Sequence, residues 1–207
     1  MIFPSLLFAS LALAAATPGR DSRVKPAEQD KMVLSLSESE TALFAGGHFW
    51  SLEKHFDSLR KKGVLSTTAG YSGGTSEHPT QKAVADHRES VQVVFSPKKI
   101  NYEKLVEEFL RQTDPYDDHG QFCDQGEQYR SAIFFENENQ RRSAEKVIHS
   151  LEAKLGKGKF TTALLPAHAF HPAEPLNQEF FETNPVSYKL YLFGCGREER
   201  LEAVWGG

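Results

Sequence analysis

The chain has 207 residues, of which 39% are hydrophobic and 25% are charged. This balance is ordinary for a globular protein with one sizeable core. The formal net charge is -4 and the pI is about 6.1, with Lys and Arg scattered rather than clustered. Because nucleic-acid-binding proteins usually carry dense basic patches, we expect no nucleic-acid partner.

The N-terminal segment differs from the rest of the chain. Residues 2–16 form a nearly uninterrupted apolar run that ends in three alanines before Thr17. This pattern predicts a cleaved signal peptide over residues 1–16 and export to the periplasm or the cell exterior. The run is shorter than the roughly 20 residues of a membrane span. No Lys or Arg precedes it, so an uncleaved anchor is the alternative; after cleavage we expect no membrane association.

Residues 17–38 are polar and proline-containing, and they predict a linker before a single domain over residues 39–207. Within the domain, short β-branched or alternating runs predict strands at 40–45, 64–71, 91–95, 131–136 and 160–165. Apolar residues at helical spacing predict helices at 48–59, 102–112 (with Asn101 as N-cap) and 137–155. Beyond residues 177–182 the tail shows no periodicity. We therefore expect a compact two-layer α+β domain with an irregular C-terminal tail.

Four segments occur in an informative order: FAGGHFW (44–50), GYSGGT (70–75), HRE followed by VQVVF (87–95), and QFCDQGEQYRS (121–131). A weaker fifth is FHPAE at 170–174. Together they resemble the A-type peptide methionine sulfoxide reductases, from about Ala42 to Trp205. The resemblance implies an α/β plait-like (ferredoxin-like) domain that reduces methionine S-sulfoxide, either free or in oxidised proteins. It implies no bound cofactor and, in an active enzyme, a thioredoxin-like reductant.

In that family a cysteine thiolate attacks the sulfoxide sulfur, and a second thiol resolves the sulfenic acid. The disulfide is then reduced by a thioredoxin-like donor. The family pattern Gly-Cys-Phe-Trp here reads Gly47-His48-Phe49-Trp50, followed by Ser51 where many relatives have another cysteine. Histidine therefore stands at the position of the family nucleophile.

The resemblance also assigns roles to the other matched residues. Glu89 corresponds to the buried acid that protonates the sulfoxide oxygen, while Tyr71 and Tyr129 correspond to the phenols that hydrogen-bond it. Phe49 and Trp50 would form the apolar wall for the substrate methyl group, and Asp124 would orient the substrate. Taken singly, the same aromatic residues would be core residues and Glu89 a solvated one. Their co-occurrence favours a common pocket.

His48 cannot replace the missing cysteine chemically. At a helix N-terminus the macrodipole disfavours a cation, so we expect a neutral imidazole. Imidazole does not pass through the thiol, sulfenic acid and disulfide states that supply two electrons. We therefore predict that the usual reductase activity is absent or very low. The favoured hypothesis is a pseudoenzyme that binds oxidised methionine.

Three alternatives remain open from the sequence. A relocated thiol, Cys123 with Cys195 to resolve it, would give an active reductase, although the same two cysteines are also candidates for a disulfide. A metal site would use His48 with Glu89, Asp124 or Cys123, but no ligand spacing is diagnostic and we assign no metal ligands. An altered codon 48 would make the natural protein an ordinary reductase.

Overall fold

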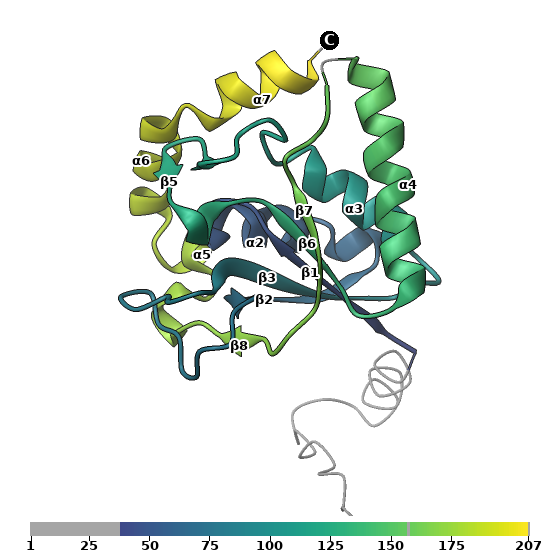
Figure 1. Cartoon of the computed structure of the whole chain (residues 1–207). Helices are drawn as coiled ribbons and strands as arrows, with labels where there is room; N and C mark the ends of the chain where they lie inside the picture. Colours follow the sequence, from purple (N-terminus) through teal and green to yellow (C-terminus); the bar gives the residue numbers. More distant parts are fainter. Residues whose placement is uncertain (1–37, 157, 207) are drawn as a thin grey trace, which may run out of the picture. The chain divides into compact units, whose positions relative to one another are not determined.

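The computed structural model of the chain describes residues 38–156 and 158–206 (Figure 1). The predicted signal peptide and all but the last residue of the predicted linker lie outside the described residues. The described part is a mixed α/β structure built around a central sheet. Within it, no helix combines the length and the hydropathy needed to cross a membrane.

The central sheet has six strands in the order β7-β6-β1-β3-β2-β8. All neighbouring pairs are antiparallel except β6 and β7, which are parallel. The strands are β1 (Glu40–Ala45), β2 (Val64–Ser72), β3 (Arg88–Phe95), β6 (Ala132–Phe135), β7 (Ala163–Pro166) and β8 (His171–Pro172). A separate two-stranded ribbon pairs β4 (Gly120–Gln121) with β5 (Asp124–Gln125). The ferredoxin-like description of the fold stays a prediction.

The helices are α2 (Phe49–Asp57), α3 (Tyr102–Leu110), α4 (Glu138–Leu155), α5 (Phe180–Thr183), α6 (Pro185–Cys195) and α7 (Arg197–Trp205). Short 3-10 turns lie at η1 (Arg60–Lys62), η2 (Glu127–Tyr129) and η3 (Pro175–Asn177). Asn101 caps α3 by accepting a hydrogen bond from the Lys104 N–H, as predicted. Asn137 caps α4 in the same way, and Gly156 ends it in the left-handed conformation.

Alternation along β1 assigns its residues to two faces of the sheet. Ala42 and Phe44 belong to the main core with α2, α3 and α4, and the Phe44 ring stacks on Phe56 and Phe109. Leu43 and Ala45 belong to a smaller cluster on the opposite side. Because β1 is buried on both faces, its apolar residues run consecutively at its C-terminal end.

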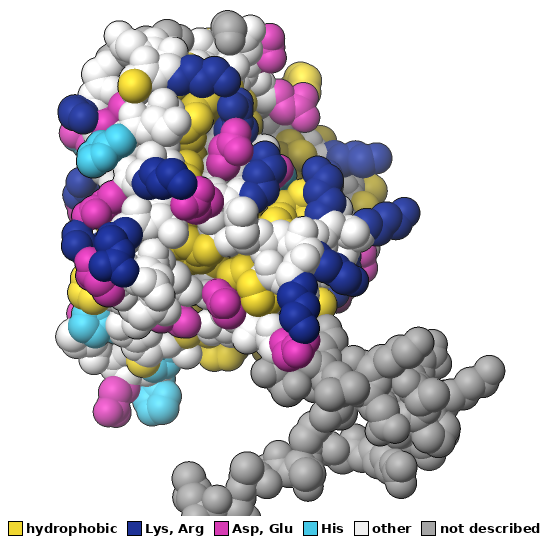
Figure 2. Space-filling model, turned by 90° about the vertical axis from the view of Figure 1, so that its right-hand side faces the viewer, with side chains coloured by type: hydrophobic (Ala, Val, Ile, Leu, Met, Phe, Trp, Pro, Cys, Tyr) yellow, Lys and Arg dark blue, Asp and Glu magenta, His cyan; other side chains and the backbone are white. Residues whose placement is uncertain are grey.

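Charged side chains of both signs are interspersed on the face that carries α4 (Figure 2). Several of them form ion pairs, such as Lys146 with Glu103 on α3 and Arg141 with Glu138 on α4. Exposed pairs of this kind contribute at most about 1 kcal/mol each to stability. The surface of α4 is therefore a solvated, mixed-charge face.

Two predictions about secondary structure are wrong. The C-terminal tail is not irregular, because α6 and α7 occupy most of residues 185–205. The predicted strand at 160–165 is displaced to Ala163–Pro166. Residues 160 and 161 instead donate their backbone N–H groups to Glu152 and Pro115, so they cannot pair with β6.

Candidate active site

A tight turn between β1 and α2 sets the position of His48. Gly47 adopts φ 79°, and a Cβ added there would lie 3.0 Å from the Cβ of Gln121. Its N–H donates a 2.9 Å hydrogen bond to the carbonyl oxygen of Tyr129, which joins the turn to η2. His48 follows as the N-cap residue of α2. A glycine is therefore needed immediately before the candidate site.

Replacement of Gly47 by Ala should lower the free energy of unfolding by about 1–2 kcal/mol, because an L-residue is strained at positive φ. Urea denaturation would measure this loss. Gly194→Ala is the matched control, since Gly194 lies inside α6 with no atom within 4 Å of an added Cβ. That control should leave stability unchanged or raise it by up to about 1 kcal/mol. Equal effects at both positions would contradict the assignment.

Two carboxyl groups cap the first turn of α2 from outside the helix. Asp124 accepts a 3.1 Å hydrogen bond from the His48 N–H, and Glu89 accepts a 3.2 Å bond from the Phe49 N–H. The side chain of His48 makes no capping bond of its own. Free N–H groups at a helix N-terminus require such acceptors. The sequence placed Glu89 and Asp124 at the same site as His48, and the structure brings all three together.

The His48 imidazole lies among four aromatic rings. Its ring centroid is 3.9 Å from that of Trp50 in a stacked arrangement. The rings of Phe49, Tyr191 and Tyr129 follow at 4.9, 5.7 and 6.3 Å. Burial lowers the pKa of His48 to about 4, so the imidazole is neutral at pH 7. The neutral imidazole was expected from the helix dipole, whereas in the structure the cause of its low pKa is burial.

Glu89 is almost completely buried below the helix N-terminus, with 1% of its surface exposed. Burial raises its pKa to about 8, opposed by the hydrogen bond from the Phe49 N–H and assisted by the charges of Asp124 and Glu174. The carboxyl is therefore mainly protonated at pH 7 and can donate a proton. His48 Nδ1 lies 3.2 Å from Glu89 Oε2, but the geometry of this contact is not that of a hydrogen bond. Nδ1 has no hydrogen-bond partner among the described residues.

The two predicted phenols have different surroundings. Tyr71 is fully buried, and its hydroxyl donates a 2.8 Å hydrogen bond to Glu174. Tyr129 is partly exposed in η2, and burial, with the nearby Glu89 and Asp124 charges, raises its pKa. Tyr129 is thus available as a donor to a ligand, whereas the hydroxyl of Tyr71 already has an acceptor.

Several residues at this site were missed by sequence reasoning. Glu174 links Tyr71 to Asn177, whose side chain accepts a 3.3 Å bond from the Trp50 indole N–H. Phe180 stacks on the other face of Trp50 at 3.7 Å. The match of the FHPAE segment to the family pattern was the available signal for Glu174. No motif in the sequence pointed to Phe180.

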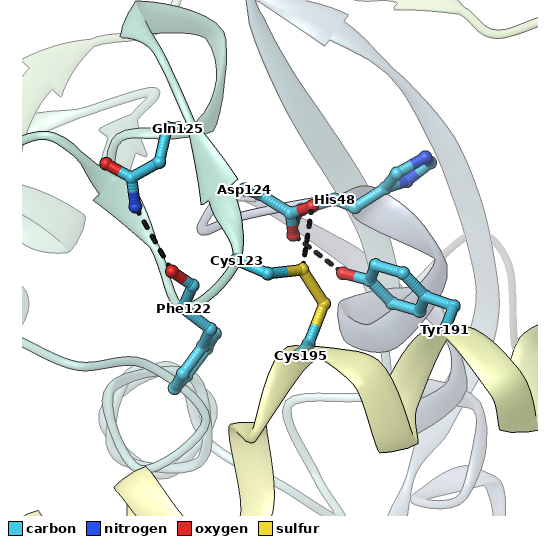
Figure 3. The surroundings of a disulfide bond; sticks show 7 residues. All are labelled: His48, Phe122, Cys123, Asp124, Gln125, Tyr191 and Cys195. Carbon is cyan, nitrogen blue, oxygen red and sulfur yellow. Dashed lines mark hydrogen bonds between the residues drawn. A yellow bond between two sulfur atoms is a disulfide. The ribbon is translucent and has the colours of Figure 1, made fainter.

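Tyr191 was also missed, because it lies on α6 in the tail that was predicted to be irregular. Its hydroxyl donates a 2.6 Å hydrogen bond to Asp124, as Figure 3 shows. Burial raises the pKa of Asp124, while the bonds from Tyr191 and the His48 N–H and the charge of Arg197 oppose this rise. Asp124 therefore connects α6 to the N-terminus of α2.

Cys123 and Cys195, the two cysteines of the chain, form a disulfide between the β4–β5 ribbon and α6. Figure 3 shows the His48 imidazole pointing away from this bond. Among the described residues, one group of three side chains has possible metal-ligand atoms close together, namely Cys123, Asp124 and Cys195. His48 is not part of this group. The two sulfurs cannot act as thiolates while they are bonded to each other.

These elements define an α/β protein in which a protonated carboxyl and several aromatic rings lie together at the N-terminus of α2. The family described as "Peptide methionine sulfoxide reductase" matches residues 40–207. Peptide methionine sulfoxide reductase MsrA of Bacillus licheniformis is 43% identical over 172 residues, covering 81% of this chain and 94% of that protein.

Solved structures agree with this match. Methionine sulfoxide reductase A of Corynebacterium diphtheriae gives a TM-score of 0.65 at 31% identity, over 72% of this chain and 76% of that one. Mxr1 from Saccharomyces cerevisiae in reduced form gives a TM-score of 0.68 at 27% identity, over 72% of this chain and 88% of that one. The chain belongs to the peptide methionine sulfoxide reductase family, which acts on methionine sulfoxide.

Proposed function

We propose that this protein recognises methionine S-sulfoxide but does not reduce it. The observation that carries the proposal is the lack of a thiol where the reaction needs one. His48 occupies the N-terminus of α2, and the only two cysteines of the chain are bonded to each other. Without a thiolate, the oxygen of the sulfoxide has no acceptor and no electron pair is supplied to the sulfur.

Recognition of the sulfoxide is supported by the groups that remain around His48. A protonated Glu89 and the hydroxyl of Tyr129 are hydrogen-bond donors suited to a sulfoxide oxygen. The Trp50 ring suits the soft methyl group next to the sulfur. The His48 imidazole already stacks on one face of that ring and Phe180 on the other. A ligand methyl group therefore competes with these two rings for contact with Trp50.

Export forms part of the proposal. The apolar run of residues 2–16 is typical of a signal peptide. Disulfides persist in oxidising compartments, and both cysteines of this chain are in a disulfide. The proposed ligand is accordingly oxidised methionine in proteins outside the cytoplasm.

A second candidate function is reduction by a relocated thiol. The observation in its favour is that Cys123 Sγ lies 3.7 Å from Asp124 Oδ1, and Asp124 also binds the N-terminus of α2. This function requires the Cys123–Cys195 bond to open and a thioredoxin-like donor to keep it open. Substitution of Cys123 by Ser would then abolish all turnover. A metal site at His48 has less support, since no described cysteine, histidine or carboxylate completes a three-ligand cluster with it.

Calorimetric titration with an N-acetylated methionine S-sulfoxide amide tests recognition directly. We expect saturable binding at pH 6.5 that weakens as the pH rises through about 8, the pKa of Glu89. Above that pH the carboxyl is ionised and no longer donates. The contribution of Glu89 to the free energy of unfolding is lost progressively as the pH rises from its ordinary pKa of 4.5 to about 8. Glu89→Gln should keep a donor at every pH and abolish the pH dependence.

Two variants make the titration specific. His48→Ala should bind more tightly than the parent, because it frees one face of Trp50 and removes no capping hydrogen bond. Glu53→Gln is the control at a second buried carboxyl, which lies on α2 and whose pKa burial raises to about 7. This variant should leave the change near pH 8 in place. If the parent and His48→Ala bind the S-sulfoxide no better than the R-sulfoxide or methionine, the proposal is wrong.

A further inference from the structure

Three side chains with possible metal-ligand atoms meet between the β4–β5 ribbon and the end of α6. The sulfurs of Cys123 and Cys195 and a carboxylate oxygen of Asp124 all lie within 4.8 Å of one another. Cys123 Sγ is 3.7 Å from Asp124 Oδ1, and Figure 3 shows the carboxylate facing the two sulfurs. Because Cys123 is exposed and Cys195 is half-buried, a reductant or an ion can reach the cluster from solvent.

Asp124 is held in place with one oxygen left for a ligand. Its Oδ2 accepts hydrogen bonds from the His48 N–H at 3.1 Å and from the Tyr191 hydroxyl at 2.6 Å. Oδ1 is the oxygen that faces Cys123. A carboxylate that binds a metal is itself usually oriented by hydrogen bonds from residues around it. Asp124 is therefore preorganised for an ion that lies beside the sulfurs.

The charges around the cluster suit a divalent cation. Two thiolates and one carboxylate together carry three negative charges, and a divalent ion supplies two positive ones. Arg197 supplies the third, because it is 5% exposed and its charge acts on Asp124. The group as a whole is then neutral, which avoids the cost of an uncompensated charge in a partly buried place.

We propose that Cys123, Cys195 and Asp124 bind Zn²⁺ when the disulfide is reduced, with water as the fourth ligand. Thiolate and carboxylate ligands in a tetrahedral arrangement suit zinc, and two sulfurs bound to one such ion lie about 3.8 Å apart. Rotation of the two cysteine side chains reaches this separation once the bond is open. The site requires no binding of methionine sulfoxide, and it excludes the His48 imidazole, which points away from the sulfurs.

Oxidation and zinc binding compete for the same two sulfurs. A dithiol reductant of the thioredoxin type passes two electrons and two protons to the Cys123–Cys195 bond and becomes a disulfide itself. Zinc displaces these two protons as it binds the two thiolates. The ion then replaces the disulfide as a link between two residues separated by 72 positions in the sequence. Zinc and the disulfide are thus alternative links at one junction.

Titration of the reduced, tag-free protein with Zn²⁺ tests this site. The protein is reduced with a phosphine, separated from it without oxygen, and titrated in competition with a chromophoric chelator, with Co²⁺ as the spectroscopic probe. We expect one ion per reduced chain, none per oxidised chain, and sulfur-to-cobalt charge-transfer absorption. Zinc should also raise the urea concentration at which the reduced protein unfolds, because it binds the native state. Equal binding by the oxidised protein, or cobalt binding without charge-transfer absorption, would overturn the site.

Three variants locate the ion. Tyr191→Phe keeps the ring but removes the hydroxyl that holds Asp124, so it should weaken zinc binding by about 10- to 100-fold. Asp124→Asn removes the anionic oxygen and should weaken binding at least as much, with the charge-transfer absorption retained. His119→Ala, at an exposed histidine just before β4, should bind like the parent. If Tyr191→Phe and Asp124→Asn both bind zinc as tightly as the parent, two thiols alone hold the ion and the three-ligand site is wrong. Should Asp124→Asn fail to fold, Tyr191→Phe alone decides.

Discussion

The His48→Cys variant should reduce a methionine S-sulfoxide peptide with dithiothreitol, while the parent protein should not. The new thiol would stand at the N-cap of α2, where the free N–H groups and the helix dipole stabilise a thiolate. Glu89 would supply the proton for the sulfoxide oxygen. The rate should exceed that of the parent by roughly 100-fold or more, since a positioned nucleophile and acid contribute at least this factor.

His48→Ser is the matched control, because it introduces a side chain similar in size to cysteine that cannot enter the redox cycle. It should remain inert. The Cys123→Ser/Cys195→Ser double variant, combined with His48→Cys, separates the first chemical step from resolution by the native cysteines. Turnover by the parent that disappears on Cys123→Ser would contradict the proposed function and support the relocated thiol.

Loss of the Cys123–Cys195 disulfide should cause the largest change in stability. The two cysteines are separated by 72 residues in the sequence. In the chain-entropy treatment, a loop of this length contributes about 4 kcal/mol to the free energy of unfolding. Urea denaturation of the Cys123→Ser/Cys195→Ser variant, or of the parent with dithiothreitol, should show this loss.

The double variant also provides the control for the reductant. Its unfolding curve should not change when dithiothreitol is added, because it has no disulfide to reduce. Thiol titration of the parent under the same conditions confirms whether the bond has opened. A parent that contains two titratable thiols yet unfolds at the same urea concentration as the oxidised form would refute the prediction.

Elements with strong local signals could be predicted from the sequence. The helix α4 was bounded correctly because Asn137 caps it and its apolar residues recur at helical spacing. Strand β1 was correct to the residue, because a short apolar run before two glycines has few other interpretations. The grouping of His48, Glu89 and Asp124 came from the family resemblance, since these residues are far apart in the sequence and share no local pattern.

The missed elements depend on tertiary contacts that a local pattern does not contain. The helix α6 has apolar residues on most sides and two glycines near its end, which argues against an amphipathic helix. Pro185 at its start and the disulfide at its end favour the helix instead. Tyr191 could therefore not be placed at Asp124. The bonds from Glu174 to Tyr71 and Asn177 similarly depend on how residues 173–178 return to β2.

The helix α6 joins two features of the molecule that were described separately. Tyr191, which holds Asp124 at the site, lies four residues, or about one turn, before Cys195 in the disulfide. A ligand that prefers the site with Tyr191 in place must bind the oxidised protein more tightly than the reduced one. By thermodynamic reciprocity, the same ligand then protects the disulfide against reduction by an equal factor. Occupancy of the proposed site would thus change the reduction potential of the Cys123–Cys195 bond.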